Sequence, residues 1–222
     1  MAQHLDLEEQ EQLDRIKHFW NAWGTLISSV VIVVFGGMAA WNGYQYWQGR
    51  QAMQAAALSE AIEVAVEAKD TARVEQAFLD LKEHYAGTAQ AGIGGLMAAK
   101  ALVDAGKVDA AKGMLAWVAG NASDAGHKAL ARLRLSSVLV QEKAYDEALK
   151  ELGASMPPEF DAAVADRKGD ILVLQDKKAE AIAEYTKAYK RFDEGLEFRR
   201  LVEAKLNALG VNPAATTPGA QK

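Results

Sequence analysis

The sequence contains no cysteine and only four prolines among its 222 residues. The absence of cysteine excludes disulfides, thiolate metal sites and cysteine nucleophiles, and it leaves the redox compartment open. The scarcity of proline, together with many alanine, leucine and glutamate residues, favours helices. A strongly basic balance is also lacking, since the formal net charge is −5. The composition therefore indicates a helical protein with no nucleic-acid partner.

Charge is missing from one long stretch near the N-terminus. After Lys17 the next Asp, Glu, Lys or Arg is Arg50. As a helix, Gly24 to Tyr44 would be roughly 31 Å long, close to the thickness of a bilayer's hydrocarbon core. Aromatic residues flank both ends, as expected where rings gather at the two headgroup levels; they are Trp20, Trp23, Trp41, Tyr44, Tyr46 and Trp47. The pattern predicts a transmembrane helix over residues 23–46.

Two other interpretations of the uncharged stretch stay open. A core helix of a soluble domain has little reason to place aromatic rings at both ends. A cleaved signal peptide has a shorter apolar region behind a basic start, whereas residues 1–17 hold five acidic and two basic residues. The segment Gly37-Met38-Ala39 does resemble a small-residue cleavage site. An uncleaved signal anchor fits the pattern best.

The basic residues on either side of the span predict its orientation. Arg15 and Lys17 precede it, and only Arg50 follows it closely. Lys and Arg mark the cytoplasmic side, so the sequence predicts a single-pass type II protein of the bacterial inner membrane. Its N-terminus would be cytoplasmic and its C-terminal domain periplasmic.

Small residues inside the span are candidates for contact with another membrane helix, because they let two backbones approach closely. They are Gly36, Gly37, Ala40 and Gly43.

The remainder of the chain repeats. Four segments share an alanine, followed four residues later by a large residue and preceded twelve residues earlier by a small one. The alanines are Ala77, Ala111, Ala148 and Ala181, the large residues are Leu81, Leu115, Leu152 and Tyr185, and the small residues are Ala65, Ala99, Ser136 and Gly169. A period near 34 residues with small residues at two positions is typical of the tetratricopeptide helix pair, in which antiparallel helices approach closely and stack on the next pair.

The predicted fold is therefore all-α. A single N-terminal transmembrane helix precedes a tetratricopeptide-like α-solenoid of about four helix pairs with a C-terminal capping helix. The predicted segments are 1–22, cytoplasmic; 23–46, the signal anchor; 47–209, the periplasmic repeat domain; and 210–222, a disordered tail rich in Pro, Gly and Thr.

Several segments, in their order and spacing, resemble a known family, the ancillary subunit of the bacterial SecYEG translocon. They are "EEQEQLDRIKHFWNAWG", "WNGYQYW", "YAGTAQAGIGGLMAAK", "ALARLRLSSVL", "DRKGDILVLQDKKAEAIAEY" and "EAKLNAL". The resemblance covers nearly the whole chain. It implies a tetratricopeptide-like inner-membrane protein that associates with the SecYEG translocon and with periplasmic chaperones, including a membrane-anchored prolyl-isomerase-like protein.

The sequence carries no recognisable motif for catalysis, a metal or a cofactor. The histidines His4, His18, His84 and His127 are too scattered for a motif such as H-E-x-x-H. The stretch Gly92-Ile93-Gly94-Gly95 lacks the lysine and hydroxyl of a phosphate loop, and it instead predicts close helix packing. A Ser-His-Asp set assembled in space stays open. We expect a protein that is not an enzyme and needs no cofactor.

We expect the function to lie on a surface instead. In this repeat class the first helix of each pair lines a concave groove, which suits extended segments and amphipathic helices such as those of unfolded exported proteins. The candidate groove residues are Ile62, Val66, Ile93, Leu96, Lys100, Val103, Leu130, Leu133, Arg134 and Val140. Lys100 and Arg134 could hold a partner carboxylate at the rim, and many of the apolar residues could equally belong to the core.

Three functions follow as hypotheses. The first is a non-enzymatic, membrane-anchored interaction protein that links exported proteins at the SecYEG translocon to periplasmic chaperones. The second is a periplasmic tetratricopeptide scaffold for envelope or cell-wall assembly, which the anchor and repeats fit equally well. The third, a membrane-bound enzyme, is disfavoured.

Overall fold

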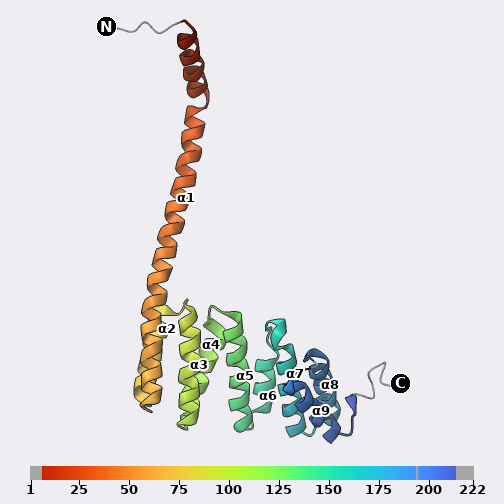
Figure 1. The fold of residues 1–222 in the computed structure, drawn as a ribbon. Helices are drawn as coiled ribbons and strands as arrows, with labels where there is room; N and C mark the ends of the chain where they lie inside the picture. The colour runs from red at the N-terminus through yellow and green to blue at the C-terminus, as the bar shows by residue number, and fades with distance from the viewer. Residues whose placement is uncertain (1–6, 194, 214–222) are drawn as a thin grey trace, which may run out of the picture. The chain divides into compact units, whose positions relative to one another are not determined.

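The computed structural model describes residues 7–193 and 195–213, and the regular structure of these residues is helical. The elements are α1 (Leu7–Glu67), α2 (Thr71–Tyr85), α3 (Ala89–Asp104), α4 (Val108–Asn121), α5 (Ala125–Gln141), α6 (Tyr145–Leu152), η1 (Pro158–Phe160), α7 (Asp161–Leu174), α8 (Lys178–Arg191) and α9 (Glu197–Ala208) (Figure 1). The prediction of an all-α fold with a long apolar N-terminal helix, four helix pairs and a capping helix is confirmed.

The chain divides into two compact units, residues 1–51 and 52–222, and the division falls within α1. In the first unit the large apolar side chains point to the outside. Ile32, Val33 and Phe35, for example, are 71%, 73% and 66% exposed. By length and composition α1 can cross a membrane. Lipid would cover such an all-round apolar surface, which fits a membrane anchor.

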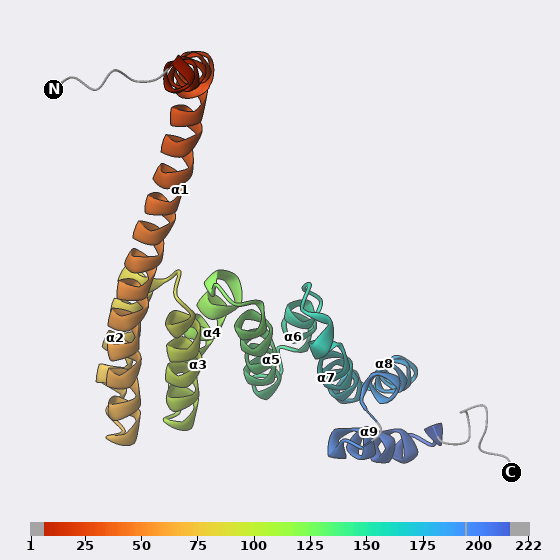
Figure 2. The same ribbon diagram turned by 45° about the horizontal axis from the view of Figure 1, so that its top comes forward.

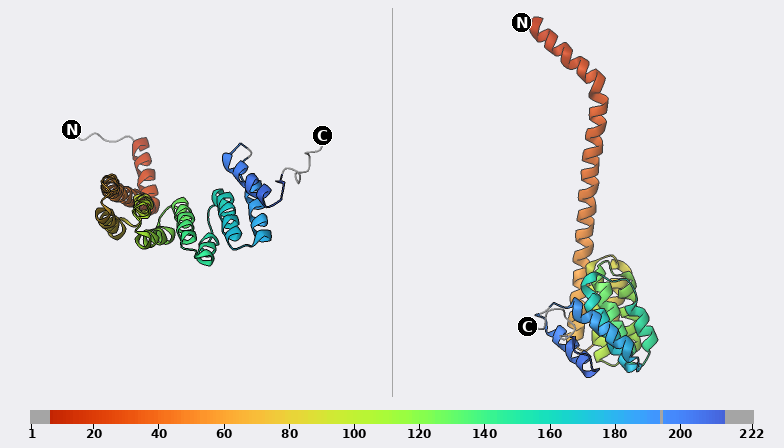
Figure 3. Two further views of the ribbon diagram at one scale, coloured as in Figure 1. Left: turned by 90° about the horizontal axis from the view of Figure 1, so that it is seen from below. Right: turned by 90° about the vertical axis from the view of Figure 1, so that its right-hand side faces the viewer.

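The second unit is a row of helix pairs. Residues 52–67 of α1 pair with α2, α3 with α4, α5 with α6, and α7 with α8; we call the earlier member of each pair the first helix. α3 and α5 stand side by side, with α4 behind them (Figure 1). Seen from below, the pairs follow one another along a curve (Figure 3). This arrangement puts the first helices together in one layer.

The same turn joins the two helices of every pair. It contains one residue with a left-handed backbone, namely Lys69, Gly106, Lys143 or Asp176, with φ of 55°, 76°, 63° and 60°. The N–H of the following residue donates to the carbonyl five residues back, as from Asp70 to Ala65 at 2.9 Å, which is the Schellman ending of a helix. Helix α9 ends in the same way at Gly210, so it is built like the first helix of a fifth pair.

The left-handed residues of these turns give the alignment of the four pairs, and this alignment differs from the predicted one in the first pair. Ala111, Ala148 and Ala181 each lie five residues after a left-handed residue and are fully buried. In the first pair the residue at that place is Val74, which is 1% exposed, whereas the predicted Ala77 is only half-buried. The predicted alignment of the first repeat was therefore wrong by three residues. Three residues are almost one helical turn, so both alignments keep the same face of the helix.

The stacking depends on close approach between helices. With the corrected alignment, each pair has a residue on its first helix and another sixteen positions later at equivalent places. The four combinations are Ile62 with Phe78, Ala99 with Leu115, Ser136 with Leu152 and Gly169 with Tyr185, and all eight residues are buried. A Cβ on Gly169 would lie 2.5 Å from the Tyr185 ring. In the fourth pair, the bulky Tyr185 of α8 thus packs against Gly169 of α7, where no side chain is in the way.

Glycines of α3 likewise make room for bulky side chains of the neighbouring pair. A Cβ on Gly94 would lie 2.6 Å from Leu81, and one on Gly95 would lie 2.8 Å from Phe78. Gly94 and Gly95 thus make room for side chains of the first pair, whereas a Cβ on Gly92 would lie 2.8 Å from His127 of α5, and one on Gly95 would also lie 2.5 Å from Val118 of its own pair. This is the close packing that the sequence predicts for the stretch Gly92-Ile93-Gly94-Gly95.

The cap α9 is fastened by a half-buried polar network as well as by Val202 and Leu206 of the core. Its Lys205 Nζ lies 2.7 Å from a carboxylate oxygen of both Asp166 and Asp170 on α7, and the Tyr185 hydroxyl donates to Asp170 at 2.8 Å. Burial raises the pKa of Asp166 above its ordinary value, and the bond from Lys205 opposes that rise. The cap follows α8 (Figure 2), and its outer surface includes two large apolar side chains, since Phe198 and Leu201 are 62% and 51% exposed.

The pairing of Gly169 with Tyr185 generates a first prediction. Gly169→Ala should lower the free energy of unfolding by about 1–3 kcal/mol because the added methyl overlaps the ring. Tyr185→Leu, which installs the residue found at Leu115 and Leu152, should relieve that cost. Urea unfolding of the full chain and the three variants in mild detergent gives the coupling energy between the two sites. Additive effects of the two substitutions would contradict the proposed contact.

The network around Lys205 generates a second prediction. Lys205→Met should cost about 1–2 kcal/mol at pH 7.5, because it leaves two half-buried carboxylates without their cation. The pKa of Asp166 then rises further above its ordinary value of 3.8. A carboxyl with a raised folded-state pKa destabilises the protein as pH rises through that pKa, so the cost should shrink toward pH 4.5.

The measurement is urea unfolding of both proteins at the two pH values. Lys187→Met is the control, because Lys187 is exposed and its amine lies 4.0 Å from Glu184, so the change should cost about 0.5 kcal/mol or less. An equal cost of Lys205→Met at both pH values would argue against the network.

Candidate functional site

The first helices carry a row of valines at equivalent positions. Each valine lies three residues before the left-handed residue of its turn; the four are Val66, Val103, Val140 and Val173. The first three are half-buried and Val173 is 39% exposed. Val66 and Val103 each line one of the hollows described below, and Val140 and Val173 repeat their position in the next two pairs.

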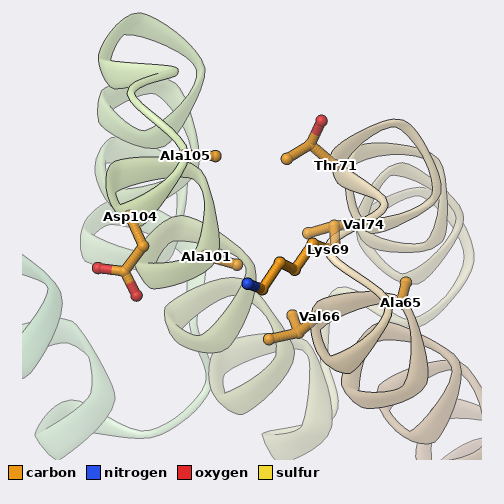
Figure 4. A pocket seen from close by; sticks show the side chains of 8 residues that line it. All are labelled: Ala65, Val66, Lys69, Thr71, Val74, Ala101, Asp104 and Ala105. Carbon is orange, nitrogen blue, oxygen red and sulfur yellow. The ribbon is translucent and has the colours of Figure 1, made fainter.

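A first hollow lies between the end of α1 and the last turn of α3. Its volume is about 340 Å³, and it is lined by Ala65, Val66, Lys69, Thr71, Val74, Ala101, Asp104 and Ala105. Figure 4 shows the Lys69 side chain reaching across it toward Ala101, while the Asp104 carboxylate points away from Lys69. The hollow therefore has apolar walls and one amine extending into it.

A second hollow lies one repeat further on, between α3 and α5. Its volume is about 280 Å³, and its lining residues are Ala99, Lys100, Val103, Asp104, Leu115, Arg134, Ser137, Val138 and Gln141. Three of these positions are equivalent to positions in the first hollow: Val103 to Val66, Val138 to Ala101, and Gln141 to Asp104. The repeat of the fold thus produces a repeated hollow, and Asp104 borders both.

The charges at the two hollows are unequal. Lys100 Nζ lies 2.6 Å from Asp104, so these two charges compensate one another. Arg134 Nη1 instead donates to the main-chain carbonyl of Leu96 at 3.1 Å, which lays the half-buried guanidinium across α3. Within the described part of the chain, no carboxylate pairs with Arg134 or with Lys69. The surface of the two hollows is therefore cationic.

The remaining predicted groove residues differ in exposure. Ile62 and Leu96 are buried, at 0% and 6% exposure, and belong to the core. Leu130 and Leu133 are half-buried against that core, and Ile93 is 41% exposed. The structure brings Val66 into the first hollow, and Lys100, Val103 and Arg134 into the second.

The beginning of the solenoid offers a further hollow, of about 550 Å³. It lies between residues 57–65 of α1 and residues 73–80 of α2, and Val64 is 58% exposed there. In α3 the positions that correspond to Ala57 and Ala61 are Gly94 and Ala98, which are buried by the preceding pair. This end of the stack thus presents a stacking face to the outside.

The candidate contact in the apolar part of α1 is open. A Cβ on Gly36, Gly37 or Gly43 would meet no atom within 4 Å, and Ala40 is exposed. The backbone is accessible along this side of the helix, as a close helix–helix approach requires.

Titratable groups do not gather into a site with metal-binding character. Among the described residues, no three His, Asp or Glu side chains come together in a way that could hold a metal ion. His18, His84 and His127 lie on α1, α2 and α5, and His4 lies outside the described residues. The site that the structure offers is the pair of hollows on the valine row.

Comparison with known proteins identifies the family of this chain. A family model described as a tetratricopeptide repeat-like domain matches residues 17–211. A protein of Neisseria gonorrhoeae named ancillary SecYEG translocon subunit is 34% identical over 213 residues, which cover 94% of this chain and 100% of that protein. A protein of the same name from Escherichia coli is 28% identical over 206 residues, covering 91% and 97%. This chain therefore belongs to the family of ancillary SecYEG translocon subunits, with a tetratricopeptide repeat-like domain.

Proposed function

We propose that the protein is a non-enzymatic, membrane-anchored subunit of the SecYEG translocon that links exported proteins to periplasmic chaperones. The observation that carries the proposal is the match along the whole length of a relative that bears the translocon subunit's name. The apolar α1 and the repeat domain behind it supply the two physical parts that such a role requires, an anchor and a docking surface.

The proposed topology is type II in the bacterial inner membrane. Residues 1–22 lie in the cytoplasm, 23–46 form the anchor, 47–209 form a periplasmic repeat domain, and 210–222 form its tail. The bias of basic residues toward the N-terminal side of the span supports this orientation. The repeat domain then stands where exported chains emerge.

The anchor would let weak contacts suffice. Tethering holds the repeat domain at a high effective concentration beside the translocon, which raises occupancy without new contacts. The groove can therefore release a client or chaperone readily and still meet it often. The chaperones would include a membrane-anchored prolyl-isomerase-like protein, whose own tether adds to this effect.

Small residues in the anchor are the proposed contact with a translocon helix. Gly36, Gly37, Ala40 and Gly43 leave the backbone of α1 accessible. In a membrane, helices associate through such close backbone approach, since lipid tails remove the hydrophobic drive.

Affinity purification of the full chain from inner membranes in mild detergent tests the proposal. SecYEG subunits should be enriched over a control purification of an unrelated single-span membrane protein. The double variant Gly36→Leu/Ala40→Leu should lower their yield about tenfold, since losing roughly 1.4 kcal/mol of helix packing has that effect. Val34→Leu/Met38→Leu is the matched control, because these exposed residues lie on the opposite face of the same span, and it should leave the yield unchanged. Enrichment of cell-wall or outer-membrane assembly proteins without SecYEG would contradict the proposal.

A further inference from the structure

The two hollows lie one repeat apart, the first between α1 and α3 and the second between α3 and α5. They share Asp104 at their border and place equivalent residues in equivalent walls. Each has a volume near the lower end of the range for small-ligand sites, about 300 Å³. Their apolar walls come from Val66, Ala101, Val103 and Val138. An occupant can therefore present one small apolar side chain to each hollow.

The spacing of the hollows selects the conformation of the occupant. Neighbouring helices in contact lie about 8–10 Å apart, and a polyproline II chain advances about 3.1 Å per residue with three residues per turn. A segment that crosses the first helices in polyproline II form thus brings every third side chain, all on one face, over a hollow. In a β-strand, side chains three residues apart would point to opposite faces. A helix, which rises only about 1.5 Å per residue, would need six or so residues for the same step.

The charges select the chemistry of the occupant. Each hollow has one cation that no described carboxylate compensates: Lys69 in the first and Arg134 in the second. The bond from Arg134 to the Leu96 carbonyl fixes the guanidinium before a ligand arrives, and a fixed group loses less entropy on binding. Its remaining N–H donors suit a carboxylate oxygen. A basic segment would meet the uncompensated cations Lys69 and Arg134 and be repelled.

We propose that the two hollows together form a groove that binds a segment in polyproline II form, carrying two carboxylates about three residues apart, separated by small apolar side chains. One carboxylate meets Lys69, the other meets Arg134, and the apolar side chains enter the two hollows. The inference rests on the proposed function, because it names the class of segment that the docking domain would take from an exported protein or a chaperone.

Fluorescence anisotropy of labelled peptides with the full chain in mild detergent tests the inference. The probe is a blocked peptide with two glutamates three residues apart among valines and glycines. Its glutamine and lysine versions are the comparison peptides. At low salt the acidic peptide should bind about tenfold more tightly than the glutamine version, since two charge-assisted hydrogen bonds are lost. The lysine version should bind least.

Variants of the chain locate the effect. Arg134→Ala and Lys69→Ala should each weaken binding of the acidic peptide about fivefold or more and leave the glutamine version unaffected. Arg134→Lys should retain part of the affinity, because it keeps the charge and loses the planar donor pair. Lys82→Ala is the matched control, since this exposed lysine lies on α2, outside both hollows. Circular dichroism confirms that each variant is folded.

Two results would overturn the inference: equal binding of the acidic and glutamine peptides, or unchanged binding by Arg134→Ala. The experiment separates this inference from the proposed function. Arg134→Ala should still co-purify with SecYEG, because the anchor is intact. If wild type co-purifies but does not select the acidic peptide, only the groove inference fails; selection of the peptide without SecYEG co-purification sinks only the proposed function.

Discussion

The structure depends on one constraint, the close approach of helices at positions where side chains are small. A tetratricopeptide-like pair cannot bury its apolar stripe alone, so each pair must stack on the next. Gly169 against Tyr185, and Gly94 and Gly95 against Leu81 and Phe78, show how size is matched within and between pairs. Because the fit is steric, a bulky side chain limits the size of the residue that it contacts. Tyr185, for example, leaves no room for a side chain at Gly169.

Repetition of that packing produces the functional surface. Equal turns at Lys69, Gly106, Lys143 and Asp176 hold the first helices in the same register, and the valines three residues earlier fall into a row. One hollow therefore lies between α1 and α3 and another between α3 and α5. Their apolar walls come from equivalent positions, whereas their charged residues differ. The two hollows are thus similar sites one repeat apart, which the proposed function assigns to segments of extended chain. The anchor determines where that surface is presented.

Much of this could be predicted from the sequence, because helix period and steric size are local properties. The apolar helix, the four pairs, the cap and the buried small residues Ala99, Ser136 and Gly169 all follow from spacing. The alignment of the first pair could not be predicted from spacing, since a shift of three residues keeps the same helix face. Only the position of the turn at Lys69 shows that Val74, and not Ala77, is equivalent to the buried alanines of the other pairs. The close approach of Ile62 to Gly94 and the bond from Arg134 to the Leu96 carbonyl join residues more than 30 positions apart, which periodicity does not encode.

The central claim is that α1 anchors the repeat domain on the far side of the inner membrane from the N-terminus. The chain has no cysteine, so a single introduced thiol reports on one position. Ser123→Cys lies in the repeat domain and Gln12→Cys near the start of α1, and both positions are exposed. In cells with a permeabilised outer membrane, a membrane-impermeant maleimide should label Ser123→Cys at once and Gln12→Cys only after the inner membrane is disrupted. Labelling of Gln12→Cys in intact inner membranes, with Ser123→Cys protected, would contradict the account.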